Sequence, residues 1–77
     1  MFLVIALKYK RIYELRVDHD YTQSMVGKKI GVSQRTYAYY EKGERMLPPE
    51  VLSALANLYH VSVDYILERT DNPEMND

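Results

Sequence analysis

Apolar side chains recur three or four positions apart in several short stretches of this chain, with polar side chains between them. This spacing places the apolar side chains on one face of a helix. Ile12 and Leu15 mark the first such stretch, and Val26 and Ile30 mark the second. The expected helices span residues 8–18, 22–30, 34–42, 49–59 and 63–67. The pattern therefore predicts an all-α chain of five short helices around one core.

Capping residues stand at the borders of these stretches. Thr22, Ser33 and Ser62 each precede a helix, and a hydroxyl there can accept a hydrogen bond from a free helix amide. Gly31 and Gly43 each follow a helix, where glycine tolerates the left-handed backbone that ends it. The helix borders are therefore marked in the sequence itself.

The chain is long enough for one domain, which we place at residues 8–69. A domain of this size buries roughly 60% of the surface that its unfolded chain exposes. The acidic tail, residues 70–77, is expected to fray. Residues 1–7 are apolar, but crossing a bilayer takes about 20 residues, and no basic residue precedes them as in a signal peptide. Extended structure, a longer first helix and packing on a partner chain all remain open for this segment.

Charge is unevenly distributed along the chain. The net charge of −1 argues at first sight against a nucleic-acid partner. Residues 8–45, however, carry nine basic and five acidic side chains, and residues 46–77 carry one and six. A basic half can face phosphates while the acidic half points away, although charge alone does not separate this arrangement from a solvated surface.

The absence of cysteine fits a reducing cytoplasm.

Only Gly31, Val32 and Ser33 connect the second and third expected helices. A tight connection that contains glycine is typical of two helices of which the second projects and enters a DNA major groove. Gly27 lies in the second helix, although glycine inside a helix costs about 1 kcal/mol relative to alanine. We interpret it as the place where the third helix passes close to the second.

The helix over residues 34–42 has two different faces at about 100° per residue. One face is expected in the core and consists of Tyr37, Tyr40 and Glu41. The other is an arc of about 140° that consists of Gln34, Arg35, Ala38 and Tyr39, with Thr36 at its border. Glutamine can pair with adenine and arginine with guanine, and an alanine methyl can touch thymine. From this wheel alone, an ordinary solvated surface helix is the simpler interpretation.

Several short motifs occur in a fixed order along the chain. They are Arg11-Ile12-x-Glu14-Leu15-Arg16, Tyr21-Thr22-Gln23, Gly31-Val32-Ser33-Gln34, Tyr40-Glu41-Lys42-Gly43, Pro48, Leu55-Ala56, Val61-Ser62-Val63-Asp64-Tyr65-Ile66-Leu67 and Arg69-Thr70-Asp71-Asn72-Pro73. Together they closely resemble the Cro/repressor-type (Xre-family) helix-turn-helix regulators of bacteria and prophages. The resemblance implies a compact five-helix, lambda-repressor-like domain with the helix-turn-helix at about residues 22–42. It also implies transcriptional regulation through DNA, most simply repression, in the cytoplasm at the nucleoid.

The same resemblance implies roles for individual residues. The positions that face bases are Gln34, Arg35, Thr36 and Tyr39. The positions that bind phosphate are Gln23, Ser33, Lys42 and Arg45. Arg16 and Glu41 match a structural ion pair that ties the first helix to the recognition helix.

Three departures from the family pattern bear on DNA affinity. Tyr37 stands where an aliphatic residue is usual, and Tyr39 where a long polar side chain is common. Glu44, Met46 and Leu47 make the phosphate-binding loop less basic.

No set of residues suggests an enzyme, a cofactor or a metal site. His19 and His60 lie in separate elements without cysteine, so we interpret them as solvent-exposed or capping residues rather than ligands. The eight tyrosines are expected as core or interface rings with hydroxyls that reach water. An alternative function is a protein-interaction module, such as an antitoxin or antirepressor with weak DNA binding, which the acidic C-terminal half keeps open.

A repressor of this size is expected to act as a homodimer on palindromic double-stranded DNA. One small module buries roughly 600 to 1,000 Å² on DNA, which is little for tight discrimination between sites. The seam is expected on the fourth and fifth helices, with residues 1–7 as a candidate extension. Its residues are Leu58, Tyr59, Val61, Tyr65 and Ile66. No membrane partner is expected.

Overall fold

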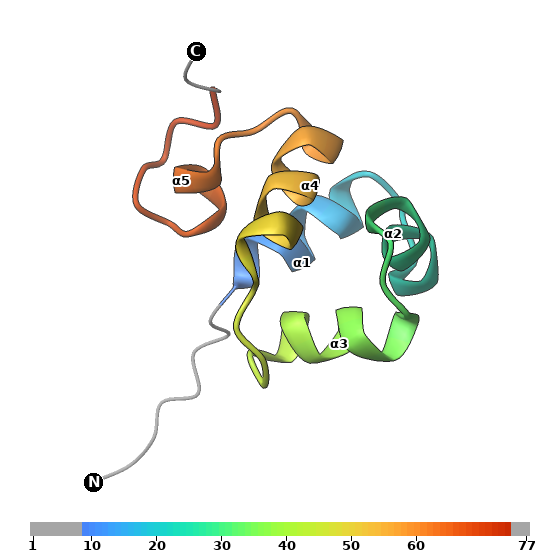
Figure 1. The fold of residues 1–77 in the computed structure, drawn as a ribbon. Helices are drawn as coiled ribbons and strands as arrows, with labels where there is room; N and C mark the ends of the chain where they lie inside the picture. Colours follow the sequence, from blue (N-terminus) through green and yellow to red (C-terminus); the bar gives the residue numbers. More distant parts are fainter. Residues whose placement is uncertain (1–8, 75–77) are drawn as a thin grey trace, which may run out of the picture.

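A computed structural model of the chain describes residues 9–74. Its five helices are α1 (Lys10–Asp18), α2 (Gln23–Ile30), α3 (Gln34–Lys42), α4 (Pro49–Tyr59) and α5 (Val63–Ile66), and the described part contains no strand. In Figure 1, α3 runs along the lower edge and α1 and α4 lie above it. α2 lies at the right-hand end of α3, and α5 lies at the upper left, beside α4. The all-α prediction is confirmed. The expected first-helix start at Lys8 and the apolar segment over residues 1–7 lie outside the described residues.

Three helices begin at the hydroxyl residues that the sequence marked. The Thr22 hydroxyl accepts the Met25 amide at 3.1 Å, and the Ser62 hydroxyl accepts the Tyr65 amide at 3.0 Å. Ser33 caps α3 in the same way. Each such cap stabilises its helix by about 1 kcal/mol, so these starts are determined locally.

The chain leaves every helix through a residue with positive φ. These residues are Asp20, Gly31, Gly43, His60 and Glu68. After each of them, the next amide donates to a carbonyl five residues back, as from Val32 to Gly27 at 2.9 Å. This is the Schellman arrangement, which satisfies the free carbonyls at a helix end. Two of the five positions are glycine, and the other three hold a Cβ atom in a backbone region that L-residues disfavour.

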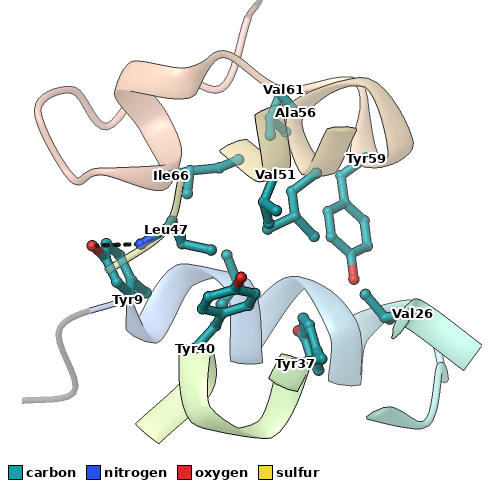
Figure 2. Close-up of a cluster of buried hydrophobic side chains, with 12 residues drawn as sticks. Tyr9, Val26, Tyr37, Tyr40, Leu47, Val51, Ala56, Tyr59, Val61 and Ile66 are labelled. Atoms are coloured by element: carbon teal, nitrogen blue, oxygen red, sulfur yellow. Dashed lines mark hydrogen bonds between the residues drawn. The ribbon is translucent and has the colours of Figure 1, made fainter. Parts of the chain in front are cut away.

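One core joins all five helices. Each helix contributes one fully buried side chain, and these are Ile12, Val26, Tyr37, Leu55 and Ile66. Figure 2 shows the core between α4 above and α1 and α3 below, with tyrosine rings filling much of the space. Full burial of one such side chain stabilises the fold by about 1.5 to 3 kcal/mol.

Tyr9 fixes the loop that connects α3 to α4. Its ring is buried just before α1, and its hydroxyl accepts the amide of Leu47 at 3.2 Å, the dashed line in Figure 2. Leu47 is itself buried. The loop after α3 is therefore anchored to the start of α1.

Arg11 of α1 holds the segment that follows α5. Its guanidinium lies over the ring of Tyr65, with Cζ 4.0 Å from the ring centroid, and donates to the Tyr65 carbonyl and to Asp71 Oδ1. The amide of Ser62 donates to the carbonyl of Pro73 at 3.0 Å. As far as Pro73, this docking differs from the frayed tail expected over residues 70–77.

The structure corrects the expected dimer seam. Tyr59, Val61 and Ile66 are buried in the core of the chain itself, so they offer no surface to a partner. Leu58 and Tyr65 are half-buried, and Arg11 covers one face of the Tyr65 ring. The apolar surface that these residues leave is smaller than the sequence suggested. Over residues 9–74, no helix has the length and apolar character needed to span a membrane.

Candidate nucleic-acid interface

The crossing of α2 and α3 depends on Gly27. A Cβ atom at this position would lie 2.8 Å from the carbonyl oxygen of Val32 and 3.4 Å from backbone atoms of Ser33. Gly31 completes the turn with φ 83°. The structure confirms that Gly27 marks the close approach of the two helices.

The two faces of α3 differ in burial as the helical wheel predicts. Tyr37, Tyr40 and Glu41 are buried against the rest of the chain, whereas Gln34 and Arg35 are exposed. Thr36, Ala38 and Tyr39 are half-buried. Figure 1 shows the other helices on one side of α3, with its lower side uncovered. Within residues 9–74, a polar face at the edge of the structure is thus free to contact a large partner.

An ion pair fixes the orientation of α3. Nε of Arg16 lies 2.6 Å from Oε2 of Glu41, and a second Arg16 nitrogen donates to Oε1 at 3.2 Å. Arg16 also donates to the carbonyl of Tyr21, at the end of the loop before α2. The Arg16 side chain is 15% exposed and that of Glu41 6%. Since one guanidinium holds three elements, the pair positions α3 on the rest of the fold.

Glu41 also contacts Gln23, in the first turn of α2. The Gln23 amide nitrogen donates to Oε1 of Glu41 at 3.2 Å. An amide group has two N–H donors, so this contact orients Gln23 and leaves one donor for another acceptor. Sequence reasoning placed Gln23 and Glu41 in separate roles and missed the bond between them.

Burial and charge set the protonation of this region. The hydrogen bond with Glu41 raises the pKa of Arg16, so the guanidinium keeps its charge. Burial raises the pKa of Tyr37 and of Tyr59 well above the ordinary value, and the negative charge of Glu41 raises both further. Neither phenol oxygen has a hydrogen-bond partner within residues 9–74. These two hydroxyls therefore differ from the expected tyrosines with hydroxyls at water.

The remaining candidate residues lie at the two ends of α3. The hydroxyls of Ser33 and Thr36 lie 3.0 Å apart and are hydrogen bonded at the start of the helix. Lys42 and Arg45 are exposed at its end. The guanidinium of Arg45 lies over the ring of Tyr39, with Cζ 4.8 Å from the centroid, a contact that the sequence analysis did not anticipate.

The described residues offer basic and amide groups rather than metal ligands along this face. In residues 9–74, no three His, Cys, Asp or Glu side chains lie close enough together to bind a metal ion. The groups beside α3 can donate hydrogen bonds to base edges and to phosphate oxygens.

Comparison with known proteins agrees with this geometry. Residues 12–66 match the Helix-turn-helix family. The chain is 42% identical over 65 residues to the uncharacterized HTH-type transcriptional regulator YobD of Bacillus subtilis (strain 168), covering 84% of this chain and 58% of YobD. It is 40% identical over 53 residues to the cryptic phage CTXphi transcriptional repressor RstR of Vibrio cholerae, covering 69% of this chain and 48% of RstR. The chain thus spans about half the length of the curated relatives it matches.

A solved structure shows the same fold. The P22 c2 repressor protein, crystallised in complex with synthetic operator 9T in the presence of Tl+, aligns with a TM-score of 0.76 at 31% sequence identity. The alignment covers 84% of this chain and 98% of that chain.

Proposed function

The chain belongs to the Helix-turn-helix family, in its Cro/repressor (Xre) branch, and from this premise we propose that it represses transcription by binding double-stranded DNA. The observation that carries the proposal is the uncovered polar face of α3, opposite the buried face with Tyr37, Tyr40 and Glu41. Two matched proteins are named repressors, and one of these was solved on an operator. Both names support repression.

Gln34 and Arg35 are the proposed base-reading residues. Both are exposed in the first turn of α3, the part of a recognition helix that contacts base edges in the major groove. Glutamine donates to and accepts from adenine, and arginine donates two hydrogen bonds to guanine. A good pair of this kind contributes about 1 to 3 kcal/mol of discrimination.

Phosphate contacts are proposed on both sides of the reading turn. Gln23, oriented by Glu41, presents its second N–H at the start of α2, where helix amides also favour an anion. Ser33 lies at the start of α3, and Lys42 and Arg45 at its end. These contacts set the position of the helix on the duplex without reading sequence.

Selection of bound duplexes from a random pool, followed by binding measurements, tests this proposal. Arg35→Ala and Gln34→Ala should each weaken binding to the selected duplex by about 1 to 3 kcal/mol and relax preference at one base pair. Lys42→Ala should weaken all duplexes alike and lower the salt dependence. Arg69→Ala is the matched control, since Arg69 is an exposed arginine beyond α5, paired with Asp64.

Two results would overturn the assignment. If the pool yields no preferred sequence and the chain instead co-purifies with a stoichiometric protein, the alternative of an interaction module holds. Suppose that Arg35→Ala lowers affinity equally for selected and random DNA, and by no more than Arg69→Ala does. In that case α3 does not read bases.

We also propose that the working unit is a twofold dimer on a palindrome. One module supplies little discrimination on its own, and symmetry then sets half-site centres about 34 to 36 Å apart. Leu58 of α4 and Tyr65 of α5, both half-buried, are the remaining seam candidates. Sedimentation with a palindromic duplex should show two chains per duplex at saturation. One chain per duplex, with a footprint on a single half-site, contradicts the dimer.

A further inference from the structure

The loop after α3 bends its backbone back onto the helix. Gly43 adopts φ 75°, its amide donates to the carbonyl of Tyr40 at 3.1 Å, and the amide of Glu44 donates to the carbonyl of Tyr39 at 2.9 Å. These two bonds close the Schellman arrangement at the end of α3. They bring the next residue, Arg45, back beside the helical turn that carries Tyr39.

Arg45 uses this position to place its guanidinium over the ring of Tyr39. Its Cζ lies 4.8 Å from the ring centroid, within the range of about 6 Å over which a guanidinium is attracted to an aromatic face. Tyr39 is half-buried and Arg45 is exposed. Within residues 9–74, no carboxylate lies within 4.0 Å of the Arg45 guanidinium, and no hydrogen bond to it is formed. Its N–H donors are therefore oriented by the ring and still available.

We propose that Tyr39 is a positioning residue that holds the Arg45 guanidinium for a DNA phosphate, rather than a reader of base edges. The inference rests on the proposed function and reassigns one residue of the same face. A guanidinium stacked on a ring keeps its N–H groups directed outward in its own plane, the geometry that binds two phosphate oxygens at once. The ring also restricts the rotamers of a flexible side chain before binding, so less entropy is lost when the phosphate is bound.

The place of Tyr39 along α3 supports this role. It lies five residues after Gln34, about 7.5 Å further along the helix axis at 1.5 Å per residue. Lys42 follows three residues later on the same helix. Tyr39 thus lies nearer the phosphate-binding end of α3 than the reading turn.

The test compares binding of the full chain to its selected duplex and to a random-sequence duplex of equal length, over a range of salt concentrations. Arg45→Gln should lower affinity for both duplexes by the same factor and reduce the slope of log affinity against log salt by about 0.9. Tyr39→Leu removes the ring but keeps an apolar side chain, and it should weaken binding to both duplexes about two- to five-fold. Tyr39→Phe keeps the ring face and should bind within about twofold of the parent.

The double variant Tyr39→Leu with Arg45→Gln separates positioning from reading. If Tyr39 acts through Arg45, the double variant binds no more weakly than Arg45→Gln alone. The proposal is overturned if Tyr39→Leu loses affinity only on the selected duplex, if Tyr39→Phe loses as much as Tyr39→Leu, or if the two losses add. Thermal melting of each variant shows whether the fold is kept. If Tyr39→Leu unfolds, the two single variants Tyr39→Phe and Arg45→Gln still decide between positioning and reading.

A measurement without DNA keeps this inference distinct from the proposed function. In the parent, the side-chain protons of Arg45 should show a ring-current shift in the NMR spectrum, which Tyr39→Phe retains and Tyr39→Leu abolishes. If that shift is absent, the stack does not form and the inference fails. If the shift is present but the parent binds no duplex, it is the proposed function that fails.

Discussion

Gly27 and Val32 lie so close together that a Cβ atom at position 27 would stand 2.8 Å from the Val32 carbonyl oxygen. The crowded atom belongs to the backbone, so it cannot turn aside as the end of a flexible side chain can. α2 and α3 therefore cross at a distance that only glycine permits, and the position of α3 depends on that distance.

Gly27→Ala tests the crossing. Helix propensity alone predicts a gain of about 1 kcal/mol, whereas forced repacking costs about 1 to 3 kcal/mol. Since backbone must move, we expect a lower free energy of unfolding in urea, by about 1 kcal/mol, and weaker DNA binding. Ser24→Ala on the same helix is the control for propensity and should raise stability by up to about 0.5 kcal/mol. A Gly27→Ala protein at least as stable as the parent contradicts the crowding argument.

Glu41→Ala should be among the most damaging single substitutions. It leaves the Arg16 guanidinium without its buried partner and removes the acceptor of Gln23. Loss of one partner of a buried pair costs about 3 to 5 kcal/mol, which denaturant unfolding measures. Lys10→Ala is the matched control, because the Lys10–Glu68 pair is exposed and 3.9 Å long, and such pairs contribute about 0 to 1 kcal/mol. Equal effects of the two substitutions would show that the Arg16–Glu41 pair is not buried in solution.

Stability should decrease at alkaline pH because of Tyr37 and Tyr59. Burial raises the pKa of both phenols above their ordinary value, which is about 10 in an unfolded chain. The unfolded chain therefore releases these protons first, so the contribution of the two tyrosines to stability is constant below about pH 10 and falls above it, by up to about 1.4 kcal/mol per pH unit for each tyrosine. Unfolding in urea between pH 7 and 11 measures this loss.

Tyr37→Phe should change that profile in two ways. At neutral pH it removes a buried hydroxyl that has no partner in the described chain, which should raise stability by about 1 kcal/mol. Above about pH 10 it should remove the contribution of Tyr37 to the loss. Tyr13→Phe, at an exposed tyrosine, is the control and should leave the profile unchanged. If the loss of stability at alkaline pH is identical in the parent and in Tyr37→Phe, the prediction is wrong.

His60→Gly should stabilise the chain. His60 is exposed and adopts φ 56°, ψ 46° at the end of α4, a region that costs a residue with a Cβ atom about 1 to 2 kcal/mol. Part of this gain is lost to the greater freedom of glycine in the unfolded chain, so we expect a net gain of about 0.5 to 1 kcal/mol by thermal or urea unfolding. His60→Ala keeps the Cβ atom and should change stability little. A gain in His60→Ala equal to that in His60→Gly would point to the imidazole rather than the backbone.

Local sequence determined the helices and the two faces of α3. Thr22 and Ser33 cap helices, and Gly31 and Gly43 end them in the left-handed conformation. Their hydrogen-bond partners lie within a few residues, so each of these interactions can be predicted from neighbouring residues in the sequence. The burial of Tyr37, with Tyr40 and Glu41, follows from helical periodicity in the same way. The resemblance to known regulators added the candidate site residues, which geometry alone would not have singled out.

The family resemblance implied the pair of Arg16 and Glu41, which lie 25 positions apart, but only the tertiary structure decided the other distant contacts. The bond from Gln23 to Glu41 depends on how α2 and α3 pack against α1. Arg11 meets Asp71 across 60 positions, so the tail that its composition marks as frayed is docked as far as Pro73. Packing angles between helices decide such contacts, and no short-range signal encodes those angles.

The expected dimer seam also depended on tertiary packing that the sequence pattern does not show. An apolar side chain suits a core and an interface equally, so the sequence pattern did not distinguish the two for Tyr59, Val61 and Ile66, which are buried in the core. A chain of 77 residues has one small core, and it draws on apolar side chains from every helix to fill it. The fold therefore used these three side chains for its own stability, and the residues that surround them determine what surface is left for a partner.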